Sequence, residues 1–328
     1  MTSRTRSTLP RRTLLLSAML IACLGSAPAL ADDFPSRPIK LIVPFSPAGG
    51  TDVIARIVGQ KLSEKLGTTI IVENRPGAAG TIGAGMVAKA DPDGYTLLLY
   101  HIAMVTAHHI QKISFDPMKD FTPIGMVAAG TNVVAINSEL PFKTLAELVD
   151  YAKKEPGKLH FGSSGTGGSD HLGGEMMQLA TEIKMTHVPY KGGGPANAAA
   201  ASGEIQMTAG TIAQSAPLIR AGKLRPLVVM QKDRSAALPD VPSAAESGYP
   251  NLNYTTWFGM WGPANMPPAV LAKISTNLKE TLETPAVQDA LRKAGVEPSY
   301  STPGEFTAST RQQYDQWNVI LKGKFTTP

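Results

Sequence analysis

Residues 44–56 read PFSPAGGTDVIAR, and residues 161–175 repeat the same pattern as FGSSGTGGSDHLGGE. Each copy follows a strand-like run and precedes apolar residues at helical spacing. Glycine lets backbone N–H groups approach a ligand, and the free N–H groups and positive dipole end of a helix start favour an anion. We therefore expect two loops, one from each of two lobes, that face one shared anionic ligand.

Either loop could instead be an ordinary tight turn between a strand and a helix, and the paired occurrence favours the binding site. Thr51 and Asp52 are residues that can cap a first helical turn. An acidic side chain is unsuited to an anion site. We expect Asp52 and Asp170 to turn back, each capping its helix or holding a loop N–H.

Strand and helix patterns alternate along the chain, which predicts parallel sheets flanked by helices. A first β-α-β-α-β run covers residues 39–100. The pattern restarts after a long extended stretch at residues 124–136, and the C-terminal residues 268–321 are mostly helical. We predict an α/β fold of two lobes around a hinge, with the ligand in the cleft between mostly parallel sheets. Lobe one comprises residues 32–130 plus about 231–328, and lobe two comprises residues 131–230.

Residues 1–31 have the features of a cleaved export signal. Four arginines and no acidic residue begin the segment, residues 13–24 are apolar but too short to span a membrane, and Ala29-Leu30-Ala31 offers a cleavage site. Two alternatives stay open: Arg11-Arg12 resembles a twin-arginine signal, and Cys23 lies in a loose lipoprotein box. The cleaved signal predicts a periplasmic protein.

Composition excludes several classes of protein once the signal is set aside. The whole chain has net charge +5, but the part after residue 31 keeps 27 basic against 26 acidic residues, so nucleic acid is not an expected partner. The single cysteine is Cys23. The mature chain therefore has no disulfide, thiolate nucleophile or cysteine metal site.

Enzyme motifs are absent from the glycine-rich stretches. Residues 162–166 lack the last glycine of a nucleophile elbow, residues 165–170 break the dinucleotide pattern, and no phosphate loop occurs. A hydrolase would need Ser164 as nucleophile with His171 as base. The adjacent His108-His109 pair is expected to point apart and to make a poor metal site. We predict no enzyme, no cofactor and no metal.

Three further residues follow strands at the expected cleft. His101 ends the third strand and could donate to a ligand oxygen, although it could equally satisfy a loop carbonyl. Tyr190 could close over the ligand, while the adjacent Lys191 could face solvent.

Eight stretches in order carry a resemblance to a known family: PSRPIKLIVPFSPAGGTDVIAR, VENRPGAAGTIGAGMVAKADPDGYTLL, FDPMKDFTPIG, FGSSGTGGSDHLGGE, HVPYKGGGPA, AGKLRPLVV, RSAALPDVPSAAESGYP and TPGEFTASTRQQYDQW. The chain resembles the extracytoplasmic solute receptors of tripartite tricarboxylate transporters, the Bug family. The resemblance implies an α/β, two-lobed periplasmic binding protein of the type II-like class that closes on a small carboxylate. The resemblance implies that loops 45–52 and 163–170 hold one carboxylate through main-chain N–H groups, partly through water. It also implies that loops 100–107 and 209–214 determine selectivity.

These expectations together define a binding protein for a di- or tricarboxylate or an aromatic carboxylate, a monomer that serves membrane transporter subunits. A ligand-sensing subunit of a membrane signalling system stays open as an alternative. The expected ligand-binding residues are Phe45, Ser46, Ala48, Gly49, Gly50, Thr51, Asp52, His101, Thr106, Ser163, Ser164, Gly165, Thr166, Gly167, Gly168, Ser169, Asp170, Tyr190 and Thr211.

Overall fold

The structure is a computed structural model that describes residues 34–321. The chain divides into a short N-terminal unit, residues 1–36, and a main unit, Arg37–Pro328. The expected signal at residues 1–31, including Cys23, lies outside the described residues. All the helices and strands below belong to the main unit.

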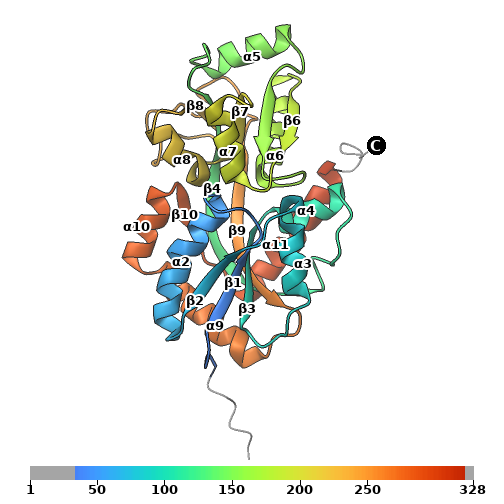
Figure 1. The fold of residues 1–328 in the computed structure, drawn as a ribbon, viewed down its shortest axis with the longest axis vertical. Helices are drawn as coiled ribbons and strands as arrows, with labels where there is room; N and C mark the ends of the chain where they lie inside the picture. The colour runs from blue at the N-terminus through green and yellow to red at the C-terminus, as the bar shows by residue number, and fades with distance from the viewer. Residues whose placement is uncertain (1–33, 322–328) are drawn as a thin grey trace, which may run out of the picture. The chain divides into compact units, whose positions relative to one another are not determined.

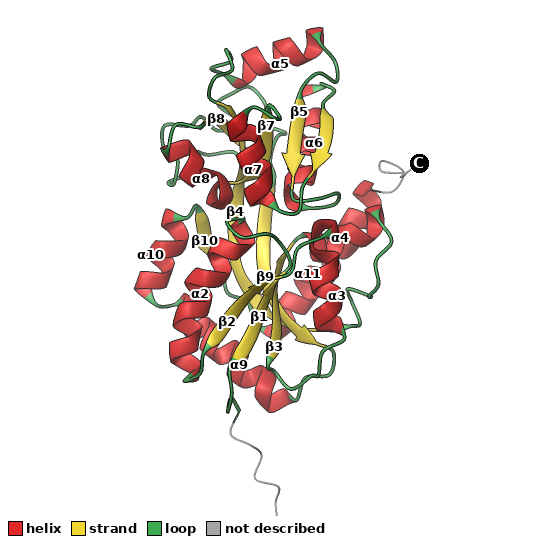
Figure 2. Cartoon of the chain, in the orientation of Figure 1, coloured by secondary structure: helices red, strands yellow, loops and turns green. Residues whose placement is uncertain are grey.

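Strands and helices alternate through most of the main unit (Figures 1 and 2). The strands are β1 (Ile39–Val43), β2 (Ile70–Asn74), β3 (Thr96–His101), β4 (Phe121–Asn137), β5 (His160–Ser163), β6 (Thr186–Pro189), β7 (Met207–Thr211), β8 (Leu224–Val229), β9 (Thr255–Pro263) and β10 (Val296–Pro298). The helices are α2 (Gly50–Leu66), α3 (Thr81–Ala88), α4 (Ala103–Ile110), α5 (Leu145–Lys154), α6 (Ser169–Thr181), α7 (Gly193–Ser202), α8 (Ile212–Arg220), α9 (Pro268–Leu282), α10 (Pro285–Lys293) and α11 (Pro303–Leu321), with a short 3-10 turn η1 (Ala78–Gly80).

The strands form two groups that share β4. In the first group β1 is parallel to β2 and β3, while β9 is antiparallel to β3 and to residues 121–131 of β4. In the second group β5 is parallel to β6 and β7, while β7 and β8 are antiparallel to residues 132–137 of β4. Figure 1 shows β4 passing from one group into the other.

The α/β, two-lobed fold is confirmed, and the sheets are mixed. The parallel pairs join strands that are linked through helices, as parallel strands require a crossover. The antiparallel pairs all involve β4, which contains the expected extended stretch 124–136, or the long strand β9. The exact lobe boundaries, at residues 130–131 and 230–231, stay a prediction.

Local signals in the sequence account for several helix ends. Gly67 ends α2 with a left-handed φ of 68°, and its N–H donates to the Glu64 carbonyl. Thr144 begins α5, and its hydroxyl accepts the N–H of Glu147 at 3.2 Å. The inward face of α2, with Ile54, Val58 and Leu62, is fully buried against the sheet.

Two short helices occupy segments expected to be loops. Helix α4 begins within the expected loop 100–107, and α8 begins within the expected loop 209–214. Pro217 inside α8 is a residue that normally breaks a helix, so the pattern predicted none.

The prediction that the adjacent histidines of α4 point apart is wrong. The ring centroids of His108 and His109 are only 3.5 Å apart. Both rings pack on Tyr314 of α11, with centroid distances of 4.4 Å and 5.1 Å. A shared aromatic surface therefore turns the two neighbouring rings to the same side.

Candidate ligand-binding site

A small cavity of about 10 Å³ lies between the two groups of strands, close to the least space that holds one water molecule. Its wall is built from both halves of the main unit. The lining residues are Phe45, Gly49, Gly50, Thr51, His101, Ser164, Ser169, Asp170, Gly193, Thr211, Gln214 and Phe258. Nine of these twelve belong to the predicted ligand-binding set.

Four helix starts meet at this cavity. The first residues of α2, α6 and α7 line it, and so do Thr211 and Gln214 at the start of α8. The first turn of a helix leaves backbone N–H groups without intrahelical partners, and its dipole is positive at that end. The sequence predicted two such helix starts, and the structure adds α7 and α8.

The two Gly-Gly entrances have nearly the same backbone geometry. Gly49 precedes α2 with φ −79° and ψ 164°, and Gly168 precedes α6 with φ −72° and ψ 167°. Neither helix has a side-chain hydrogen bond from its capping residue, so the expected capping by Thr51 or Asp52 in that position is wrong. Glycine holds both entrances without occupying their N–H groups with a side chain.

The helices begin one residue apart relative to the repeated motif. Gly49 is the first glycine of its motif and Gly168 the second of the other, so the third helical residue is Asp52 in α2 and His171 in α6. Asp52 Oδ2 accepts the Ala48 N–H at 3.0 Å, and His171 Nδ1 accepts the Gly167 N–H at 3.2 Å. The structural counterpart of Asp52 is therefore His171, because each side chain accepts the N–H of the residue that precedes the N-cap glycine of its helix.

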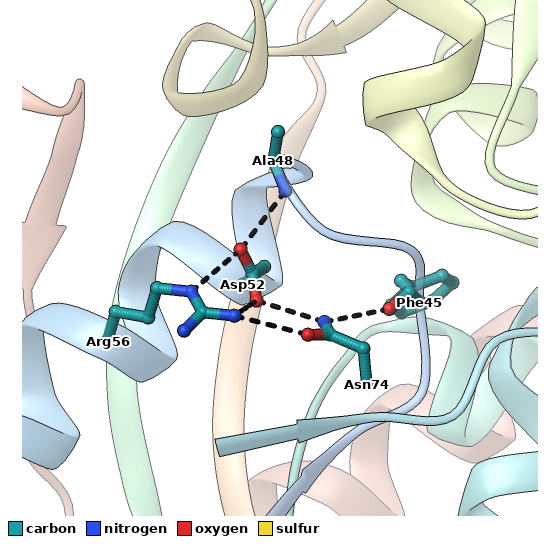
Figure 3. A network of polar contacts seen from close by, with 5 residues as sticks. All are labelled: Phe45, Ala48, Asp52, Arg56 and Asn74. Atoms are coloured by element: carbon teal, nitrogen blue, oxygen red, sulfur yellow. Dashed lines mark hydrogen bonds and ion pairs between the residues drawn. The ribbon is translucent and has the colours of Figure 1, made fainter.

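Asp52 anchors the first loop as expected (Figure 3). Its carboxylate accepts hydrogen bonds from Arg56 at 2.9 and 3.1 Å and from Asn74 at 2.9 Å, and Asn74 also donates to the Phe45 carbonyl at 3.0 Å. Burial alone would raise the pKa of Asp52, but the hydrogen bonds from Arg56, Asn74 and Ala48 outweigh it and lower the pKa. Asp52 is thus an ionised brace outside the cavity.

Asp170 holds its own loop as expected, because its carboxylate accepts the Ser164 backbone N–H. It differs from Asp52 in that it also lines the cavity. Its side chain is buried and lines the cavity, where Oδ2 accepts from Gln214 Nε2 at 3.1 Å and Oδ1 from the Ser169 hydroxyl at 3.3 Å. Among the described residues, none with a positive charge forms an ion pair with it. Burial raises the pKa of Asp170 to about 6, and hydrogen bonds from Gln214, Ser169 and the Ser164 backbone oppose the rise only in part.

Two buried hydroxyls on the cavity wall have no hydrogen-bond partner. They are Ser164 Oγ and Thr211 Oγ1, from residues that are 4% and 2% exposed. Thr211 precedes α8, where a threonine hydroxyl commonly caps the helix, but it makes no such bond here. Buried polar atoms without partners are rare in folded proteins, so these two indicate a polar ligand.

His101 is buried beside the first loop. Its ring stacks on Phe45 at a centroid distance of 4.6 Å, and its Nδ1 accepts the Ala103 N–H at 3.0 Å. Burial lowers the pKa of His101 to about 3, so the ring is neutral at pH 7. Because Nδ1 is the acceptor, Nε2 carries the proton, and the ring lines the cavity as a neutral group.

The two halves touch closely around the cavity. A Cβ on Gly50 would lie 2.6 Å from Thr211 Oγ1, and a Cβ on Gly192 would lie 2.9 Å from the Ser46 nitrogen. Ser46 donates to the Lys191 carbonyl through its N–H and its hydroxyl, both at 3.1 Å. This structure is therefore a closed arrangement, and its cavity must widen before a carboxylate can enter.

The remaining predicted residues lie near the cavity without lining it. Thr106 donates to the Gly167 carbonyl at 3.0 Å, and Ser163 Oγ is 2.5 Å from His187 Nε2. Tyr190 donates to Glu204 at 2.7 Å and does not close over the cavity. Their role in binding stays a prediction, as it does for Ser46, Ala48, Asp52, Gly165, Thr166, Gly167 and Gly168.

Two lining residues, Gly193 and Phe258, were not predicted, and Gln214 was expected only as the last residue of the selectivity loop 209–214 that the family resemblance implies. The run Gly192-Gly193-Gly194 after β6 was a third glycine-rich entrance and could have been found by the same reasoning. Phe258 carries no comparable signal, because only the tertiary fold brings it to the wall.

The described residues contain no group of three or more histidines, aspartates or glutamates placed to hold a metal ion. Residues 34–321 also contain no helix with the length and apolar character needed to cross a membrane.

Comparisons with known proteins agree on one family. The model described as "Tripartite tricarboxylate transporter family receptor" matches residues 54–324. BugT of Bordetella pertussis is 33% identical over 315 residues, which cover 95% of this chain and 97% of BugT. An R. palustris protein solved with adipate is 32% identical, with a TM-score of 0.85 over 88% of this chain and 98% of that one. MatC from Rhodopseudomonas palustris, solved with bound malate, is 28% identical, with a TM-score of 0.83 over 88% of this chain and 100% of MatC.

Proposed function

Because this chain belongs to the tripartite tricarboxylate transporter receptor family, we propose that it captures a small organic carboxylate in the periplasm for uptake by a tripartite tricarboxylate-type transporter. The ligand class is a di- or tricarboxylate or an aromatic carboxylate. The observation that carries the proposal is the meeting of four helix starts and two partnerless hydroxyls at one buried cavity.

The electrostatics of this arrangement suit an anion. Each helix N-terminus contributes roughly 0.3–2 kcal/mol toward a nearby negative charge. Several such contributions, with neutral donors in place of water, are compatible with micromolar affinity, about −8 kcal/mol. The neutral His101 fits the same purpose, because its ring lines the cavity without placing a fixed charge there.

The ligands of two similar structures support the ligand class. The R. palustris protein was solved with adipate and MatC with malate, and both are small carboxylates. The repeated loops of this chain lie at the cavity, which is where the family resemblance predicts the carboxylate. The predicted N-terminal signal supports a periplasmic location.

A catalytic role has weak support from the geometry. Ser164 Oγ, the candidate nucleophile, has no hydrogen-bond partner, and Nδ1 of its candidate base His171 accepts the Gly167 N–H. The Ser163–His187 pair lies off the cavity, and Ser163 is fully buried. A nucleophile needs an adjacent base and access to substrate, so we propose a non-catalytic receptor. The sensing-subunit alternative shares the ligand site and differs only in its membrane partner.

A thermal-shift screen of the mature protein tests the proposal. The panel contains mono-, di-, tri- and aromatic carboxylates, with sugars as uncharged controls. A ligand present at a hundred times its dissociation constant is expected to stabilise the native state by about 2.7 kcal/mol. If no carboxylate shifts the transition, the proposed function is wrong.

A matched pair of variants then locates the site. Thr211→Val removes the partnerless hydroxyl while keeping the side-chain shape, and should weaken binding by about 1 kcal/mol, or roughly fivefold. Thr211→Ser keeps the hydroxyl and should retain more of the affinity. Equal calorimetric affinities of both variants and the wild type would place the carboxylate elsewhere.

A further inference from the structure

One wall of the cavity carries the buried carboxylate of Asp170, which does not suit a ligand whose only polar groups are carboxylates. Asp170 is only 2% exposed, lines the cavity and forms hydrogen bonds with neutral partners. In the described part of the chain, no lysine, arginine or histidine is paired with it. A buried carboxylate without a cation is costly, and it also repels a carboxylate ligand. A site for an unsubstituted aliphatic carboxylate would gain from replacing it.

The orientation of Gln214 strengthens the conflict. Its Nε2 donates to Asp170, which places its Oε1 on the side of Gly193, a lining residue of the cavity. Asp170 thus fixes Gln214 with an acceptor directed away from itself. Ser164 and Thr211 add two partnerless hydroxyls, which can accept as well as donate. This wall offers mainly acceptors, while the helix starts offer N–H donors.

We propose that Asp170 determines specificity by accepting a hydrogen bond from a donor group that the ligand carries beside its carboxylate, so that the receptor selects hydroxy- or amino-carboxylates over unsubstituted ones. This inference rests on the proposed carboxylate-binding function. The ligand carboxylate lies on the N–H groups of the helix starts, and its hydroxyl or ammonium group lies against Asp170. An ammonium group would also supply the missing positive charge.

Calorimetry with a matched ligand series tests the inference. Succinate, malate and aspartate share a four-carbon dicarboxylate frame and differ in carrying no donor, a hydroxyl or an ammonium group. If the screen selects another chain length, the corresponding unsubstituted, hydroxy and amino forms are used. We expect the wild type to bind at least one substituted form tenfold or more tighter than the unsubstituted form, and the better of the two identifies the donor.

Asp170→Asn provides the decisive comparison. The variant removes the charge but keeps the shape, so the unsubstituted form should bind more tightly and the preferred substituted form less tightly. The ratio of their affinities should fall below about threefold. Asp150→Asn is the control, because it removes an exposed carboxylate from α5 that does not line the cavity, and it should preserve the ratio.

Two results would overturn the inference while leaving the proposed function intact. One is a wild type that binds the unsubstituted form as tightly as both substituted forms. The other is an Asp170→Asn variant that keeps the wild-type ratio. Failure of all carboxylates to bind would instead overturn the proposed function, and this inference with it.

Discussion

The two Gly-Gly loops share a sequence motif but use its aspartate in different ways. Asp52 of the first loop braces its own backbone and is paired with Arg56. Asp170 of the second loop faces the cavity and accepts the Ser164 backbone N–H, while His171 accepts the Gly167 N–H that corresponds to the Ala48 N–H of the first loop. A shift of one residue in the helix start exchanges the inward and outward positions. The same sequence motif at two helix starts therefore does not guarantee that its aspartates have the same role.

The largest expected effect comes from the closest contact between the halves. In Gly50→Val the new side chain would begin 2.6 Å from Thr211 Oγ1 and hold the loops apart. Overpacking of this kind costs about 1–3 kcal/mol, which corresponds to as much as a hundredfold loss of carboxylate affinity by calorimetry.

The control for this prediction lies on the same helix. A Cβ on Gly59 would meet Ile70 at 3.5 Å, an ordinary contact, so Gly59→Ala should bind like the wild type. Its helix should gain about 0.5–1 kcal/mol of stability. Wild-type affinity in Gly50→Val would show that the first loop does not close on the ligand.

The next effect concerns the pH dependence of Asp170. Because burial raises the pKa of Asp170 to about 6, the folded state holds its proton more tightly than the unfolded state, and stability falls as pH rises from about 4 to 6. Asp170→Asn should remove this loss. Its advantage over the wild type in denaturant unfolding should grow by about 2 kcal/mol between pH 4 and 7. If the stability difference between Asp170→Asn and the wild type does not change with pH, the pKa of Asp170 is not raised in the folded state.

Asp52 should show the opposite sign and a smaller effect. Its pKa is lowered in the folded state, so its contribution to stability is present at neutral pH and is lost as pH falls through that lowered pKa. Arg56 is half exposed, which limits the ion pair to about 1 kcal/mol or less. Asp52→Asn should be less stable than the wild type at pH 7, and the difference should shrink below about pH 4. A deficit that persists at pH 2 would argue against this source of stability.

The smallest effect is expected at Tyr190, beyond the second loop. Its hydroxyl donates to Glu204 and does not line the cavity. Tyr190→Phe should therefore change the calorimetric carboxylate affinity by less than about twofold, a difference well below 1 kcal/mol. A tenfold loss would restore Tyr190 to the ligand site.

The order of strands and helices could be predicted because alternating patterns and glycine ends are local signals. Gly67 and Thr144, for example, fix helix ends through their own backbone or side chain. The antiparallel course of β4 and β9 is set by pairing between residues more than a hundred positions apart, which a local pattern does not encode. Helix α8 was missed because Pro217 argues locally against a helix. The tertiary fold overrides this local signal, and the helix forms with Pro217 inside it.

The cavity wall was predicted best where it depends on backbone. Gly49, Gly50 and Ser169 follow from the glycine-rich helix starts. Asp170 was expected to hold its loop, which it does, but its place on the cavity wall was not expected from its role, because a one-residue shift in helix start cannot be seen in the motif. Phe258 was missed altogether, because strand β9 reaches the cavity only through its long-range pairing with β3 and β4.

The paired course of β4 and β9 limits how the cavity can widen. Residues 130 and 131 of β4 pair with Thr256 and Thr255 of β9 at the level where β4 changes partners. A two-stranded ribbon flexes readily across its face, but in-plane shear would break its ladder of hydrogen bonds. The halves should therefore separate by bending of the β4–β9 ribbon. The ligand should then enter and leave on the side of the cavity opposite this ribbon.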